Sequence, residues 1–83
     1  FMMFYVYMLK AVNSKITKTY VGYTNNLKLR LKKHNSGTGA KSTRGYKWKI
    51  IYKKRFYDKR LAMSFEYKLK KDFKKRRHLL SIS

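Results

Sequence analysis

The sequence predicts an α/β (α+β) sandwich whose elements follow the order β-β-α-β-α. Two aromatic and β-branched segments, 4–9 and 19–24, are separated by a short polar connection, which is typical of an antiparallel hairpin. A third segment of this kind, 47–56, follows a loop. Apolar residues with helical spacing occur before that loop and again near the end of the chain, so both periods are present in one short sequence.

Alternation along the hairpin assigns its two faces. In the first strand, Tyr7 lies on one face and Val6 and Met8 lie on the other. In the second strand, Tyr20 and Gly22 share a face, and a glycine inside a strand often marks the close approach of another group. Tyrosines on strands usually provide half-buried packing, which is the favoured interpretation for most of them. The alternative is that Tyr7 and Tyr20 present their hydroxyls together.

The first helix is expected over residues 27–34. Asn25 or Asn26 can serve as its N-cap, since a side-chain oxygen there accepts from a free backbone N–H. Leu27 and Leu31 are one turn apart and are expected to face the sheet.

The second half of the sequence predicts one more strand and a long helix. The strand is expected to alternate, with one face formed by Trp48, Ile50 and Tyr52 and the other by Lys47, Lys49 and Ile51. Asp58 is expected to cap a helix over residues 59–75. The apolar stripe of that helix consists of Leu61, Ala62, Phe65, Leu69 and Phe73.

The composition indicates a folded domain with a polyanionic partner. The 83 residues include 23 Lys plus Arg against 3 Asp plus Glu, for a net charge of +20, while 43% are hydrophobic. A single domain over residues 4–80 is expected to bind nucleic acid with this charge. The absence of Cys excludes disulfides and thiolate sites, and no apolar run approaches the roughly 20 residues of a membrane-spanning helix. Residues 1–3 precede the domain, and Phe1, before two methionines, is interpreted as a residue left by cloning.

Glu66 is the single glutamate of the chain and lies at the edge of the apolar stripe of the last helix. Taken alone, it is best interpreted as the partner of Lys70 in a helical ion pair. The functional alternative is a ligand of Mg²⁺, which often uses only one or two carboxylates together with phosphate oxygens of a substrate.

Arg30 and His34 are four positions apart and form a polar row on the first helix. In so basic a chain, a solvated helix face explains such a row. The functional alternative is a guanidinium that binds a phosphate in the transition state beside an imidazole that carries or orients a proton.

The glycine-containing segment 35–45 is a basic loop by composition. Its spacing does not match a nucleotide-binding P-loop, because Asn35 and Ala40 stand where that motif requires glycine. Free backbone N–H groups suit such a loop to a DNA or RNA backbone. The expected DNA contacts in and around it are Lys33, Lys41, Thr43, Arg44 and Lys47.

The motifs occur in an order that resembles the GIY-YIG endonuclease superfamily, and the chain is especially similar to its small single-domain bacterial members. The segments that carry the resemblance are Tyr5-Val6-Tyr7, Tyr20-Val21-Gly22, the run from Gly22 to Leu27, the run from Arg30 to Gly37, the run from Ala40 to Gly45, and Glu66. The resemblance extends over residues 4–80. It implies a three-stranded antiparallel sheet flanked by helices.

The resemblance also implies the roles of five residues. Tyr7 and Tyr20 match the two motif tyrosines, Arg30 matches the catalytic arginine, and His34 matches a histidine that many members have on this helix. Glu66 matches the glutamate that binds a single divalent metal, Mg²⁺ or Mn²⁺. Which of the two tyrosines activates the attacking water stays open.

The expected function is therefore metal-dependent hydrolysis of phosphodiester bonds by a DNA endonuclease, acting on branched or damaged DNA. A cytoplasmic, nucleoid-associated location and a protein partner for targeting are also expected. The rival hypothesis is a non-catalytic module that keeps the nuclease fold and binds nucleic acid through its charge, with a steep salt dependence and no strand breaks.

Overall fold

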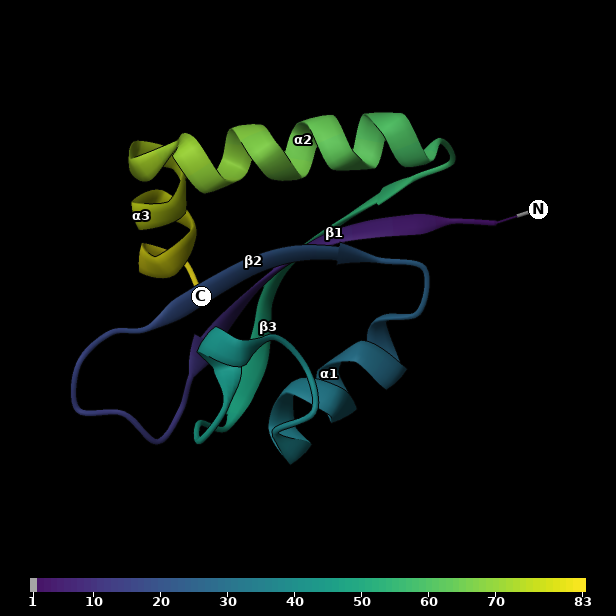
Figure 1. Ribbon diagram of the computed structural model, residues 1–83. Coiled ribbons are helices and arrows are strands. Elements are labelled where there is room, and N and C mark those ends of the chain that lie inside the picture. The colour runs from purple at the N-terminus through teal and green to yellow at the C-terminus, as the bar shows by residue number, and fades with distance from the viewer. Residues whose placement is uncertain (1) are drawn as a thin grey trace.

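The computed structural model describes residues 2–83 and contains a three-stranded antiparallel sheet with the strand order β2-β1-β3. Its elements are β1 (Phe4–Ala11), β2 (Thr19–Thr24), α1 (Leu27–Ser36), the 3-10 helix η1 (Lys41–Thr43), β3 (Trp48–Phe56), α2 (Lys59–Lys71) and α3 (Phe73–Ser81). The helix α1 lies against one face of the sheet, and α2 and α3 lie against the other (Figure 1). The predicted fold class is confirmed. The interpretation of Phe1 falls outside the described residues.

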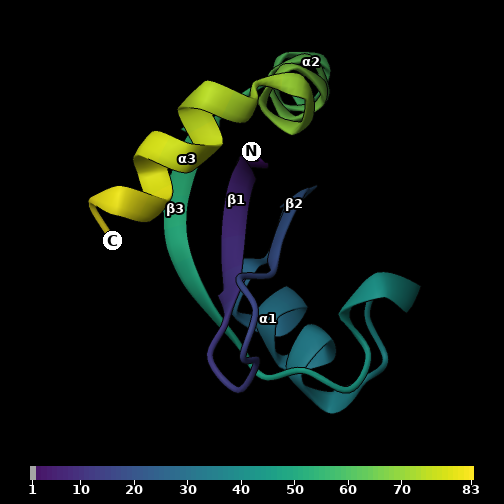
Figure 2. The ribbon, with the colours of Figure 1, turned by 90° about the vertical axis from the view of Figure 1, so that its left-hand side faces the viewer.

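The central strand β1 supplies both halves of the core. Val6 and Met8 point toward α2 and α3, where they pack with Ala62, Leu69 and Leu79. Tyr7 and its neighbours on the opposite face pack toward α1, as the alternation predicts. Figure 2 shows the sheet between the two helical layers. Within residues 2–83, no helix combines the length and the apolar character needed to cross a membrane.

The helix that positions the site has well-defined ends. The side chain of Asn26 accepts from the backbone N–H of Leu29 at 3.1 Å, so Asn26 rather than Asn25 is the N-cap of α1. The helix ends two residues later than predicted, at Ser36. Gly37 follows in the left-handed conformation with φ 82°, and its N–H is bonded to the carbonyl of His34.

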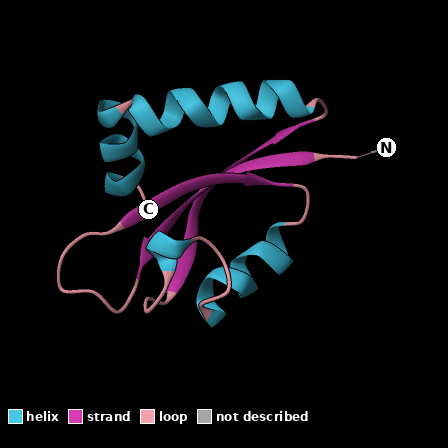
Figure 3. Ribbon diagram, in the orientation of Figure 1, coloured by secondary structure: helices cyan, strands magenta, loops and turns pink. Residues whose placement is uncertain are grey.

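The predicted helix over 59–75 is wrong in one respect, because it is broken at Asp72 into α2 and α3. The side chain of Asp72 accepts from the N–H of Lys75 at 3.0 Å and starts a new helix, which Figure 3 shows after a short break. As a consequence Phe73 leaves the stripe and is exposed. Leu61, in the first turn of α2, is also exposed, so the predicted stripe is shorter at both ends. Asp58 caps α2 as predicted.

The strict alternation predicted for the third strand is also wrong. The pairing of β1 with β3 shifts between Met8 and Leu9: Met8 faces Tyr52, whereas Leu9 faces Ile50. The extra residue, Ile51, forms a bulge that changes the face of the residues after it. Tyr52 therefore packs with the α2 side of the core, whereas Ile50 packs with the α1 side.

Candidate active site

The geometry of the site begins at Tyr7, in the middle of β1. Its side chain is buried on the α1 face, and its hydroxyl lies 2.8 Å from Nε2 of His34. Gly22, paired with Tyr7 across the hairpin, provides the space. A Cβ on Gly22 would lie 2.7 Å from the Tyr7 hydroxyl and 3.0 Å from the Tyr20 ring, so a side chain there would displace the tyrosines.

The direction of these hydrogen bonds follows from Thr43. Its hydroxyl donates its one proton to the carbonyl of Ala40 at 2.7 Å, so it can only accept from Nδ1 of His34, which lies 2.9 Å away. Nδ1 of His34 therefore carries the ring proton, and Nε2 of the neutral ring accepts from the hydroxyl of Tyr7. The result is a directed relay, from Tyr7 through His34 and Thr43 to Ala40.

The relay is enclosed by the loop and by β3. His34 and Thr43 are both 0% exposed. The indole N–H of Trp48 donates to the carbonyl of Thr43 at 3.0 Å, and Gly39 packs so closely that a Cβ there would lie 2.7 Å from Nδ1 of His34. The side chain of Thr43 thus faces the interior and its hydroxyl is occupied, which sets it apart from the other expected DNA contacts.

Tyr20 is placed differently from Tyr7. It is partly exposed on β2, and its ring centroid lies 4.8 Å from that of His34 and 6.3 Å from that of Tyr7. The structure thus brings the two tyrosines and the histidine together, with Tyr7 inside and Tyr20 toward the surface.

Burial and nearby charges set the protonation of the relay. Burial raises the pKa of Tyr7 to about 12, although the Arg30 guanidinium acts in the opposite direction; the charge of Glu66 adds to the increase. Burial also lowers the pKa of His34, and the positive charge of Arg30 lowers it further. Both groups are therefore neutral near pH 7, as the relay requires.

Arg30 lies on α1 beside a hollow of about 310 Å³ that is also lined by Phe4, Tyr23, Thr24, Asn25 and Lys59. Its Nε is buried and has no hydrogen-bond partner. A buried, unsatisfied N–H group is costly, and a phosphate oxygen bound by the same guanidinium would offset part of that cost.

Glu66 lies on α2, with its side chain 16% exposed, and pairs with Lys70 at 3.3 Å. The ion pair that was the simpler interpretation is therefore present. The side chain of Lys70 is 50% exposed, so releasing this lysine to water costs little. In residues 2–83 there is no cluster of three or more potential metal-ligating side chains. A single covered carboxylate fits an ion such as Mg²⁺, which completes its shell with water and substrate oxygens.

The remaining expected DNA contacts lie on the surface around the loop. Lys33, Lys41, Arg44 and Lys47 are all exposed, so their charges can reach a phosphate backbone. Lys47 also donates to the carbonyl of Asn35 at 3.0 Å, which links the start of β3 to the end of α1.

Comparison with known proteins agrees with this arrangement. Residues 3–79 match the family model of the GIY-YIG catalytic domain. The chain belongs to the GIY-YIG family. Membership places it among nucleases, which act on nucleic acid, and GIY-YIG nucleases generally use divalent metals.

GIY-YIG relatives of similar size occur in bacteria. A UPF0213 protein of Clostridium perfringens is 49% identical over 68 residues, which cover 81% of this chain and 70% of the relative. A UPF0213 protein of Oceanobacillus iheyensis is 45% identical over 67 residues, which cover 80% and 74%. The solution NMR structure of the UPF0213 protein BH0048 from Bacillus halodurans is similar with a TM-score of 0.54 and 36% identity, over 99% of this chain and 86% of that one.

Two components of this GIY-YIG site were not identified from the sequence. The sequence predicts a DNA contact for Thr43 and only a loop position for Gly39. Thr43 follows His34 by nine positions and belongs to another element, so no helical or strand period connects them. Their contact exists only because the loop folds back over α1.

Proposed function

We propose that this GIY-YIG domain is a divalent-metal-dependent DNA endonuclease. The observation that carries the proposal is the buried hydrogen bond of 2.8 Å between Tyr7 and His34, inside a domain that matches the GIY-YIG catalytic domain. Arg30, on the same helix as His34, adds a cation with an unsatisfied N–H group, and Glu66 adds a covered carboxylate on α2. This combination suits phosphodiester hydrolysis.

The residues have distinct roles in this proposal. Arg30 binds the scissile phosphate and stabilises the charge that it gains in the transition state. Tyr20, the more exposed tyrosine, orients the attacking water and, after giving its own proton to solvent, accepts the proton that the water loses. Tyr7 stays protonated because its pKa is raised, and it holds His34 in place beneath the ring of Tyr20. A Mg²⁺ or Mn²⁺ ion held by Glu66 would polarise the phosphate and stabilise the leaving oxygen.

The substrate is proposed to be branched or damaged DNA, in a DNA-repair role. A cytoplasmic location at the nucleoid and a protein partner for targeting belong to the same proposal, because so small a basic domain has few means of selecting a site by itself. The exposed cations of the loop, Lys41 and Arg44, would contact the backbone of the substrate.

Cleavage of a DNA panel tests the function. Duplex, flap, fork and four-way junction DNA are incubated with the protein and Mg²⁺ or Mn²⁺, with EDTA as the metal-free control. We expect strand breaks that disappear with EDTA, in Glu66→Gln and in Arg30→Ala. Lys70→Met is the matched control, because it breaks the ion pair yet keeps the carboxylate, and Lys32→Ala controls for the loss of one positive charge on α1.

The outcomes separate the hypotheses. If Lys70→Met and Glu66→Gln lose activity equally, Glu66 acts only through its ion pair and the metal role is wrong. If the wild-type protein binds all substrates with a steep salt dependence and cuts none under any metal condition, the domain is a non-catalytic binding module.

A further inference from the structure

The corner between α2 and α3 combines exposed aromatic rings with cations. We call the corner surface the group formed by Tyr67, Lys71, Phe73, Arg76 and Arg77. Tyr67 is 58% exposed and Phe73 is 57% exposed, so neither ring contributes to the core. The break at Asp72 accounts for the exposure of Phe73, because this residue starts α3 instead of continuing the stripe of α2.

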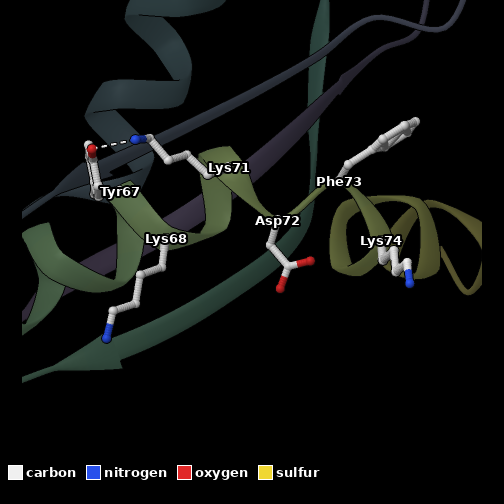
Figure 4. A pocket seen from close by; sticks show the side chains of 6 residues that line it. All are labelled: Tyr67, Lys68, Lys71, Asp72, Phe73 and Lys74. Atoms are coloured by element: carbon white, nitrogen blue, oxygen red, sulfur yellow. Dashed lines mark hydrogen bonds between the residues drawn. The ribbon is translucent and has the colours of Figure 1, made fainter.

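Phe73 stands between two hollows. One, of about 470 Å³, is bordered by Tyr67 and Lys71 on α2, and Figure 4 shows the ring of Phe73 standing beyond Asp72 at one end of it. The other, of about 440 Å³, is bordered by Arg76 and Arg77. The corner surface is therefore a hollowed strip with an aromatic ring at its middle.

The cations of the corner surface are arranged around its rings. The guanidinium of Arg77 lies 4.7 Å from the ring centroid of Phe73, and the ammonium of Lys71 donates to the hydroxyl of Tyr67. Arg76 shares an unusual property with Arg30. In the described part of the chain, the buried side-chain nitrogen and oxygen atoms that lack a hydrogen-bond partner are the Nε atoms of these two arginines.

We propose that the corner surface binds an unpaired segment of the DNA strand that extends from the cleavage site. Positive charge suits the phosphates, and exposed rings can stack on bases of any sequence; together these two features are typical of single-strand binding. Arg76, like Arg30, has an N–H group without a hydrogen-bond partner, and a guanidinium of this kind suits a phosphate oxygen. The proposal rests on the proposed endonuclease function and defines its substrate further.

The edge strand β2 runs from the corner surface to the candidate active site. Thr19, its first residue, borders the hollow beside Arg76, and Thr24, its last residue, borders the hollow beside Arg30. Five steps along a strand span about 17 Å. This corresponds to roughly five nucleotides at the rise of about 3.4 Å in a stacked strand, and to fewer when the unpaired strand is extended. An arm of one nucleotide is too short to reach Phe73 from the catalytic site.

Binding measurements in EDTA test the corner surface without cleavage. Fluorescence anisotropy compares Phe73→Ala with the wild-type protein on forked DNA with a ten-nucleotide single-stranded arm, on forked DNA with a one-nucleotide arm, and on blunt duplex. We expect affinity for the long arm to fall about tenfold, as for loss of one base-stacking ring, with the other two substrates unchanged. Leu61→Ala is the matched control, because Leu61 is 59% exposed on the same helix pair but lies outside the corner surface.

Several results would overturn the assignment. Equal affinity of Phe73→Ala and wild-type protein for the long arm removes the proposed stacking, and an equal loss on blunt duplex shows a general backbone contact. If poly-glutamate displaces the long arm from the wild-type protein but not from Phe73→Ala, the surface binds an acidic protein segment instead. Circular dichroism confirms that each variant is folded. Because the binding is measured without metal, it can be interpreted even if the protein cuts no DNA. Conversely, if Phe73→Ala binds like the wild-type protein, the proposed nuclease activity is not affected.

Discussion

Replacing Thr43 with Val removes one hydroxyl from the relay while keeping the shape of the side chain. Nδ1–H of His34 then has no acceptor in a site that is 0% exposed. An unsatisfied buried donor costs about 1–3 kcal/mol. In a domain of this size, each 1 kcal/mol lowers the melting temperature by roughly 4–8 °C. The alternative for His34 is to move its proton to Nε2, which reverses the bond to Tyr7.

The assay is nitrogen NMR of the His34 ring together with the cleavage rate. We expect the wild-type protein and Thr43→Ser to hold the proton on Nδ1, because serine keeps the acceptor. In Thr43→Val we expect the Nε2–H form to appear and the cleavage rate to fall about 5- to 150-fold, the equivalent of the same 1–3 kcal/mol. A Thr43→Val protein that keeps Nδ1–H and cuts at the wild-type rate refutes the relay. Loss of stability with an unchanged tautomer reduces Thr43 to a packing residue.

Two further predictions concern Gly22, which packs against this relay, and His34 within it. Gly22→Ala places a Cβ 2.7 Å from the Tyr7 hydroxyl, so we expect thermal denaturation to show a loss of about 1–3 kcal/mol, against no loss for Ala at exposed Ser42. His34 has a lowered pKa in the folded state, so the unfolded chain takes up the proton first, and stability falls as the pH drops below 6.5 toward the folded pKa. Denaturant titrations between pH 8 and pH 5 measure the free energy of unfolding. We expect a smaller decline toward pH 5 in His34→Asn, and an identical decline in that variant contradicts the role of His34.

The fold could be predicted where the signals are local. Alternation in β1, a cap at Asn25 or Asn26 and a cap at Asp58 each depend on signals within a few residues. All three are found, with Asn26 as the cap of α1. The break at Asp72 also has a local cause, but there two signals compete. The apolar spacing from Leu69 to Phe73 favours a continuous helix, whereas Asp72 caps a new one, and the cap prevails.

The bulge at Ile51 shows a different limit. Lys47 to Tyr52 alternates well enough to predict one strand with two regular faces. The register is decided by pairing with β1, where Met8 must face Tyr52 and Leu9 must face Ile50. Both pairs bury apolar side chains against different helices. One extra residue in β3 allows each half of the strand to bury its apolar side chains against its own helical layer. The need for this residue comes from the packing of the whole domain and cannot be seen in the sequence of β3 alone.

The candidate site divides in the same way. Tyr7, Arg30 and His34 are grouped by the resemblance to the GIY-YIG family and not by their periods. The period of α1 predicts one polar row for Arg30 and His34, and the interpretation of that row as a solvated face is wrong for His34, which is 0% exposed. Gly22 and Gly39 could not be connected with one another, because they belong to a strand and to a loop. Yet a Cβ on either would lie 2.7 Å from a relay atom, Oη of Tyr7 for one and Nδ1 of His34 for the other. The two glycines therefore let the backbone close over the Tyr7–His34 pair from two sides, which helps to hold both rings in the orientation that the hydrogen bonds to Tyr7 and Thr43 require.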